Sequence, residues 1–463
     1  MTTPEPSRQN AFLHGPLGSL FIKTALPIIL IMSTNGLQTV IDAWFLGEFV
    51  GADALAAVTL MFPAFMLLAA FSTLVASGMA SVLARTFGAG DIRAARVVFA
   101  GAHGLALLVC AVLIACFWLG GEALVNRLAD GSPSLAVMGY TYIAIVIWSS
   151  PLMFVLSING DALRSEGRLG LMTVASVITS LANIAMNYLL IVEFGYGVAG
   201  SAIGTVLAQF IALAIVVIYR TRGRTPLRYA AVSFRDWRAH WGSFLALGAP
   251  QSLSFIGISL TAAAVILSVQ RWSGEDYAAT VAAYGIITRI MTFAFMPLLG
   301  LNMAMQTIVG NNFGAQLWSR SDAGLRLGLV VALGYCLTFE VAMLLSAPVI
   351  GGIFVDDPAT IAEVGRILPV TIMLYVVAGP MMMLSGYFQA IGDARRALFL
   401  SVTRTYCFTI PLTIALPFAI GEWGIWYAGP TSEGLMLLLA LGLLAYTQSA
   451  TGCRWGVLRA AKS

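Results

Sequence analysis

An aspartate stands near the end of a long apolar segment, in the stretch TVIDAWFLG at residues 39–47. A carboxylate inside a membrane costs about 2.5 to 3.5 kcal/mol on insertion scales, and such groups are kept where they face a cavity and bind a ligand or a proton. Asp42 is therefore the first candidate for chemistry. The competing interpretation is a carboxylate that reaches the lipid headgroups, since Asp42 lies only about a turn and a half from the end of its segment.

Three apolar segments in the first half carry polar residues on one helical face. These residues are Asn35, Gln38 and Asp42, then Ser176, Ser180, Asn183 and Asn187, then Ser201, Thr205 and Gln209. Spacings of three and four place each set on one face. At about 1.5 Å per residue, Asp42, Asn187 and Thr205 lie about 8 to 10 Å from the outer ends of their segments.

The matched depths predict one cation-coupling site. Its expected members are Asp42, Asn183, Asn187 and Thr205, with Asn35, Gln38, Ser180 and Gln209 as a supporting polar stripe. For the single hydroxyl groups, hydrogen bonds to the backbone of their own helix remain the competing interpretation.

The composition identifies the class of protein that must position these groups. Of 463 residues, 59% are hydrophobic and only 10% are charged, and the mean hydropathy is +0.89. These values are typical of an integral membrane protein. The five cysteines lack the spacing of metal ligands, and the chain has only three histidines. We therefore expect no metal centre, no cofactor and no enzyme active site; H⁺ or Na⁺ would serve only as a coupling ion.

Twelve apolar segments are long enough to cross a membrane as helices, which predicts an all-α membrane protein. They cover roughly residues 21–46, 54–80, 95–119, 135–159, 169–192, 198–219, 243–269, 280–305, 324–350, 366–391, 397–420 and 430–453. With the N-terminus inside, all basic residues but Arg127, Arg271, Arg289 and Arg366 fall on the inner side. The excess of basic residues in cytoplasmic loops predicts that both termini are cytoplasmic.

The chain also repeats itself. LARTFGAGDIRAA at 83–95 and IVGNNFGAQLWSRSDA at 308–323 share Phe-Gly-Ala, about 226 residues apart. This predicts two six-helix lobes related by a pseudo-twofold axis along the membrane normal. The expected organisation is a cytoplasmic N-terminal segment at 1–20, an N-lobe at 21–219, a basic cytoplasmic linker at 220–242, a C-lobe at 243–453 and a cytoplasmic tail at 454–463.

Two further features of the apolar segments invite interpretation. Arg289 and Glu340 lie about 13 and 15 Å below the outer ends of their segments, and we expect them to form an ion pair in the second lobe. The pair would either lock two helices together or serve as a second coupling site. Pro27 removes a backbone hydrogen bond in the first helix and predicts a bend or a simple kink there.

Several motifs together resemble the multidrug and toxic compound extrusion (MATE) transporters. They are IDAWFLG, the two Phe-Gly-Ala loops, ALRSEGR, QAIGDARR, and NIAMNYLLI followed by VAGSAIGT, and the resemblance covers about residues 20 to 455. It implies two six-helix lobes that alternate between inward-facing and outward-facing forms. It also implies export of drugs in exchange for protons or sodium.

The chain departs from the family's site patterns in two places. In one branch, the resemblance implies an aspartate on helix 1, an Asn-x-x-x-Asp pair on helix 5 and a threonine on helix 6; Asp42, Asn183 and Thr205 match, but Asn187 replaces the second aspartate. In the other branch, the resemblance implies a glutamate at the start of helix 7 and an aspartate on helix 10. Here Gln251 stands at the first position, and the helix 10 stretch VVAGPMMMLSG contains no acid. We expect proton coupling through Asp42, with weak Na⁺ binding there as the alternative.

The predicted function is a secondary active antiporter that exports organic cations or related xenobiotics by alternating access. The alternative is a flippase-type exporter of lipid-linked or other amphipathic metabolites, although such proteins typically have fourteen helices and a basic cavity. The expected partners are a small drug-like molecule and membrane lipids, without nucleic acid, and the expected oligomeric state is a monomer. The expected location is the bacterial inner membrane.

Overall fold

The computed structural model describes residues 10–129, 132–223, 225–272 and 277–451, and these residues form helices and connecting turns without a strand. Ten helical segments are long and apolar enough to cross a membrane, and two bent helix pairs bring the number to twelve. The prediction of an all-α membrane protein with twelve spans is confirmed. The first nine residues of the N-terminal segment and the tail at 454–463 lie outside the described residues.

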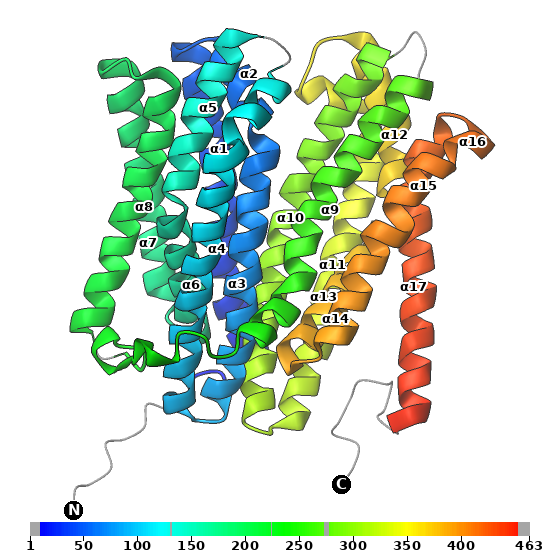
Figure 1. The fold of residues 1–463 in the computed structure, drawn as a ribbon. Helices are drawn as coiled ribbons and strands as arrows, with labels where there is room; N and C mark the ends of the chain where they lie inside the picture. Colours follow the sequence, from blue (N-terminus) through cyan, green and yellow to red (C-terminus); the bar gives the residue numbers. More distant parts are fainter. Residues whose placement is uncertain (1–9, 130–131, 224, 273–276, 452–463) are drawn as a thin grey trace, which may run out of the picture. The chain divides into compact units, whose positions relative to one another are not determined.

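The described residues of the first half form eight α-helices (Figure 1). They are α1 (Leu17–Phe49), α2 (Ala52–Leu60), α3 (Phe62–Gly88), α4 (Ile92–Leu128), α5 (Pro133–Trp148), α6 (Ser150–Ser165), α7 (Leu169–Asn187) and α8 (Gly197–Arg222). A π-helix, η1 (Tyr188–Glu193), extends α7, and two short 3₁₀ turns, η2 (Tyr229–Ala231) and η3 (Phe234–Asp236), follow α8. The expected second span is divided at Met61 into α2 and α3.

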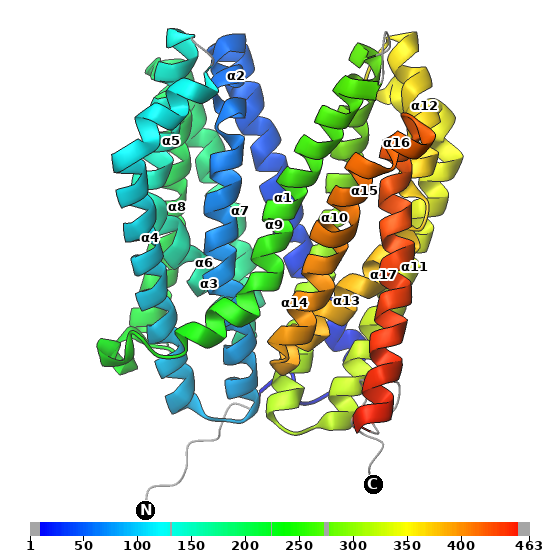
Figure 2. The ribbon, with the colours of Figure 1, turned by 45° about the vertical axis from the view of Figure 1, so that its right-hand side comes forward.

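The described residues of the second half form a further series of α-helices (Figure 2). Its α-helices are α9 (Trp241–Trp272), α10 (Tyr277–Gly314), α11 (Trp318–Ile350), α12 (Pro358–Ile372), α13 (Tyr375–Ile391), α14 (Ala394–Val402), α15 (Ile410–Ala415), α16 (Pro417–Ile420) and α17 (Trp423–Thr451). The 3₁₀ turn η5 (Gly351–Ile353) follows α11, and the π-helix η6 (Thr403–Thr409) joins α14 to α15.

The chain divides into two compact units, and the boundaries at 25/26 and 252/253 fall inside helices. One unit contains residues 1–15 and 26–252, and the other contains residues 16–25 and 253–463. The first residues of α1 thus group with the second half, and the first residues of α9 group with the first half, unlike the expected lobes at 21–219 and 243–453. The boundaries lie close to Pro27 in α1 and Pro250 in α9. The α1 helix continues through Pro27 from Leu17 to Phe49.

Each half also contains a span made of two helices that meet at a sharp bend. The α5 and α6 helices meet at 49° around Ser149, and α12 and α13 meet at 46° around Leu374. The two breaks are separated by about the same number of residues as the two Phe-Gly-Ala loops. Leu374 has a φ of +66°, a left-handed conformation that is unfavourable for a side chain without special support.

The core of the first unit extends beyond its membrane helices. Side chains of α3, α4 and α6 pack around Met79, Phe99 and Phe154, and Leu227 and Val232 from the connection after α8 pack in the same cluster. Figure 2 shows this connection, in green, at the same end of the unit as the turn between α3 and α4. Leu227 and Val232 of the expected linker at 220–242 thus contribute to the core of the first unit.

Candidate functional site

The carboxylate of Asp42 lies against the end of α7. Asn187, the last residue of that helix, donates a hydrogen bond from Nδ2 to Asp42 Oδ1 at 2.6 Å. The same Nδ2 lies 3.4 Å from Asn183 Oδ1, one turn earlier. Asn183 and Asn187 are fully buried, whereas Asp42 is half-buried. The side-chain amide of Asn187 thus links Asp42 on α1 to Asn183 on the polar face of α7.

The third helix enters the site through Thr205. Asn183 Nδ2 donates to Thr205 Oγ1 at 3.1 Å, and the Thr205 hydroxyl donates to the Ser201 carbonyl oxygen at 3.1 Å. The α7 and α8 helices pack along each other, which holds these groups together. The structure therefore brings all four predicted coupling residues into one hydrogen-bonded chain within one unit: Asp42, Asn187, Asn183 and Thr205.

The supporting stripe is only partly joined to this chain. The Ser180 hydroxyl donates to Gln38 Oε1 at 3.3 Å, one turn further along α1 and α7. Asn35 is exposed and Gln209 is half-buried, and neither side chain forms a hydrogen bond with the described residues. Of the four predicted stripe residues, the structure thus pairs two and leaves two apart.

Two residues near Asp42 carried no signal in the sequence. Gly204 of α8 faces Asn187, because a Cβ at that position would lie 2.6 Å from Asn187 Oδ1. Tyr142 of α5 packs against the cluster that contains Leu46, one turn beyond Asp42 on α1. Gly204 occurs in a small-residue stretch, GSAIG, and only the position of Asn187 reveals its contact.

The hydrogen-bond pattern limits what the site can bind. Asp42 Oδ1 accepts from an amide N–H, and the buried Asn187 Oδ1 has no hydrogen-bond partner. A carboxylate in this setting can take up a proton without rearrangement of Asn187. A sodium ion requires several oxygen ligands, so Asn187 would have to turn its oxygen toward the ion. Among the described residues, no group of three His, Cys, Asp or Glu side chains could hold a metal.

The expected ion pair between Arg289 and Glu340 is not formed. Arg289 is exposed, while Glu340 accepts hydrogen bonds from the backbone N–H groups of Leu374 at 3.2 Å and Val376 at 2.7 Å. These are unpaired donors at the start of α13, and a carboxylate is a favourable partner for them. Glu340 therefore caps the broken span, and the break itself explains why the expected pair was wrong.

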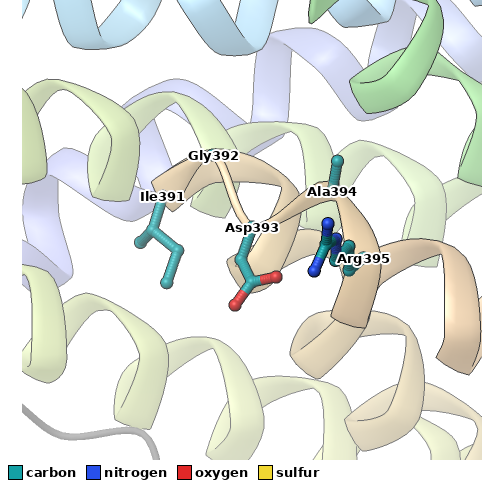
Figure 3. Close-up of a pocket in the computed structure, with 5 residues that line it drawn as sticks. All are labelled: Ile391, Gly392, Asp393, Ala394 and Arg395. Atoms are coloured by element: carbon teal, nitrogen blue, oxygen red, sulfur yellow. The ribbon is translucent and has the colours of Figure 1, made fainter.

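A shallow surface pocket lies in the second unit, at the turn from α13 to α14 (Figure 3). Ile391, Gly392, Asp393, Ala394 and Arg395 line it. Asp393 caps the start of α14 through the backbone N–H of Arg396. A carboxylate already occupies the helix N-terminus, so the pocket offers no anion site, and it contains none of the predicted coupling residues.

Sequence comparisons relate the chain to transport proteins. The MatE family model matches residues 27–189 and 250–415. The probable multidrug resistance protein YoeA of Bacillus subtilis is 24% identical over 441 residues, which cover 92% of this chain and 93% of that protein. A FAD transporter of Shewanella oneidensis is 24% identical over 435 residues, which cover 92% and 94% of the two chains.

Solved structures share the fold. A MATE structure in the bent conformation has a TM-score of 0.87 at 21% identity, covering 96% of this chain and 98% of that one. An outward-facing MATE family transporter has a TM-score of 0.85 at 22% identity, covering 94% and 97%. The twelve-span arrangement is thus that of known transporters.

Proposed function

We infer the function from one premise: the chain belongs to the MatE family, and it is a multi-pass membrane transporter of the multidrug extrusion type rather than an enzyme. We propose that it is a secondary antiporter that exports small organic molecules in exchange for protons. The observation that carries the proposal is the contact of Asp42 with Asn187, which joins an intramembrane carboxylate to a buried polar chain.

In the proposed cycle, Asp42 takes a proton from the outer side, and the neutral carboxyl group no longer favours a cationic substrate. The substrate leaves, the transporter changes to its inward-facing form, and the proton is released to the cytoplasm. Ionised Asp42 then again favours a cation. Exchange of one proton for one monovalent cation is electroneutral, so each unit of pH difference supplies about 1.4 kcal/mol, or a tenfold gradient.

The donor arrangement around Asp42 supports protons over sodium as the coupling ion. The amide nitrogen, rather than the amide oxygen, of Asn187 faces the carboxylate. Asn187 also replaces the acid that the resemblance leads one to expect there, which leaves one carboxylate for a cation that prefers several charged or carbonyl oxygens.

Vesicles with the reconstituted chain test the coupling ion. We expect an imposed pH gradient to drive accumulation of a cationic dye, and a sodium gradient at constant pH to drive none. Accumulation that follows the sodium gradient would overturn proton coupling. A dependence on membrane potential at constant pH would contradict the one-to-one exchange.

The similarity to the Shewanella oneidensis FAD transporter supports a second substrate class. An amphipathic metabolite such as a flavin nucleotide could use the same pathway as a drug. Competition between FAD and the dye in the vesicle assay tests this: inhibition of dye export by FAD supports it, and the absence of inhibition at saturating FAD contradicts it.

A further inference from the structure

The connection between α8 and α9 begins in a buried ion pair. Arg220 at the end of α8 donates from Nη1 to Glu166 Oε1 at 2.8 Å and from Nε to Asn159 Oδ1 at 2.6 Å. Both charged side chains are at most 1% exposed. The Thr225 hydroxyl donates to the second oxygen of Glu166. The first residues after α8 are thereby fixed to the end of α6.

A second set of hydrogen bonds holds the next turn. Tyr229 donates from its hydroxyl to Asn159 Oδ1 at 3.3 Å, and burial raises the pKa of this hydroxyl, which keeps it neutral. Asn159 Nδ2 lies 3.4 Å from His103 Nε2, and His103 Nδ1 lies 2.8 Å from the Phe99 carbonyl oxygen. Because a carbonyl only accepts and an amide nitrogen only donates, His103 carries its proton on Nδ1.

The remainder of the connection lies close against α4. Arg96 donates from Nε to the Pro226 carbonyl oxygen at 3.0 Å, and Trp241 donates from its indole N–H to the Gly101 carbonyl oxygen at 2.9 Å. A Cβ on Gly101 or Gly104 would overlap the backbone of Ala239 or Trp237. Such close contact fixes which side of the segment faces the unit and which faces away.

The side that faces away is basic and aromatic. Its exposed arginines are Arg222, Arg228, Arg235 and Arg238, and Asp236 is the one acid between Arg220 and Gly242. Within the described part of the chain, none of these arginines has a hydrogen-bonded or ion-paired side chain. The guanidinium of Arg238 lies 4.5 Å from the ring centre of Trp237, whose side chain is 38% exposed.

This surface must lie at the edge of the bilayer, because α8 and α9 are membrane-spanning helices, and the connection runs from the end of α8 to the start of α9. Exposed arginines and a tryptophan at that level have the chemistry that binds anionic headgroups. The general excess of basic residues in cytoplasmic loops explains why the connection has many arginines. The anchored backbone, in addition, keeps the exposed arginines directed away from the unit. We propose that the side chains of Arg222, Arg228, Arg235, Trp237 and Arg238 form a docked binding surface for anionic phospholipid headgroups.

Hydrogen exchange of the full chain in nanodiscs tests this proposal without reference to transport. We expect residues 225–240 to exchange more slowly in phosphatidylcholine with about one-quarter phosphatidylglycerol than in phosphatidylcholine alone, at about 50 mM salt, and the difference to vanish at about 500 mM. Each arginine replaced by glutamine is expected to lower the lipid preference about fivefold at low salt.

The informative variant is Arg235→Gln/Arg238→Gln, and its matched control is Arg326→Gln/Arg395→Gln, which removes two exposed arginines from the second unit. Arg235→Lys/Arg238→Lys keeps the charge and should keep the preference. Equal exchange in the two lipids, or equal loss in the control pair, would overturn the proposal. Stronger protection by a short RNA than by phosphatidylglycerol would also overturn it, and would assign the surface to nucleic acid.

Discussion

Asn187 at the end of α7 donates a hydrogen bond to the carboxylate of Asp42 on α1 at 2.6 Å, across 145 residues of sequence. The amide stands where the family resemblance leads one to expect a second acid. We therefore expect the residue type at position 187 to determine whether the site responds to sodium.

Asn187→Asp should create a sodium-responsive site. The substitution places a second carboxylate next to Asp42, and two carboxylates at hydrogen-bonding distance favour a shared proton or a bound cation. We expect a sodium gradient at constant pH to accelerate export several-fold in the variant, measured by dye accumulation in vesicles. Asn35→Asp is the matched control, since it adds the same charge at an exposed position on α1, the helix that carries Asp42. The same sodium response in both variants would contradict the prediction.

Gly204→Ala should impair transport by displacing Asn187. The added Cβ would lie 2.6 Å from Asn187 Oδ1, so the amide must shift and its contact with Asp42 must lengthen. We expect the initial rate of proton-driven export to fall about tenfold, as small displacements at a site commonly do. Gly170→Ala on α7 has open space around its Cβ and should export like the wild type. Wild-type export by Gly204→Ala would show that the position of Asn187 is not critical.

Glu166→Gln should destabilise the first unit strongly. The substitution leaves Arg220 fully buried without its counter-ion, which typically costs about 3 to 5 kcal/mol. The expected result is a lower free energy of unfolding in mixed micelles, together with faster hydrogen exchange of residues 225–232 in neutral lipid. Arg396→Gln breaks a pair whose side chains are about 30% exposed, and it should cost less than about 1 kcal/mol. Equal losses in the two variants would argue against the anchoring role of the buried pair.

Glu340 should stabilise α13 independently of Arg289. Glu340→Ala removes the acceptor of two backbone N–H groups and should lower the free energy of unfolding by about 2 kcal/mol. Arg289→Ala should change it by less than about 0.5 kcal/mol. A double-mutant cycle measured in mixed micelles is expected to give no coupling between the two positions. A coupling above about 1 kcal/mol would restore the ion pair that the sequence suggested.

The spacing of polar residues in the sequence was sufficient to identify the helices that form the candidate site. The positions of Gln38, Asp42, Ser180, Asn183, Asn187 and Thr205 follow from helical periodicity and depth. Periodicity does not determine which way an amide turns, because the orientation of Asn187 depends on its long-range contacts with α1 and α8.

Glu340 and the connection after α8 show why other features were not predictable. The cap formed by Glu340 depends on a helix break at Leu374, a residue type that does not favour a left-handed conformation. The anchoring of Thr225 depends on Glu166, 59 residues earlier in the chain. The basic composition of the connection predicted only the side of the membrane on which it lies.

The central claim is that Asp42 alone couples proton movement to export in this lobe. The most direct test is the initial rate of dye accumulation in vesicles under an imposed pH gradient, for wild type, Asp42→Asn and Glu48→Gln. Glu48 is an exposed acid on the same helix and controls for the loss of one negative charge. We predict that Asp42→Asn folds but loses proton-driven export by at least about tenfold, equivalent to about 1.4 kcal/mol, while Glu48→Gln retains it. Wild-type export by Asp42→Asn would contradict the claim.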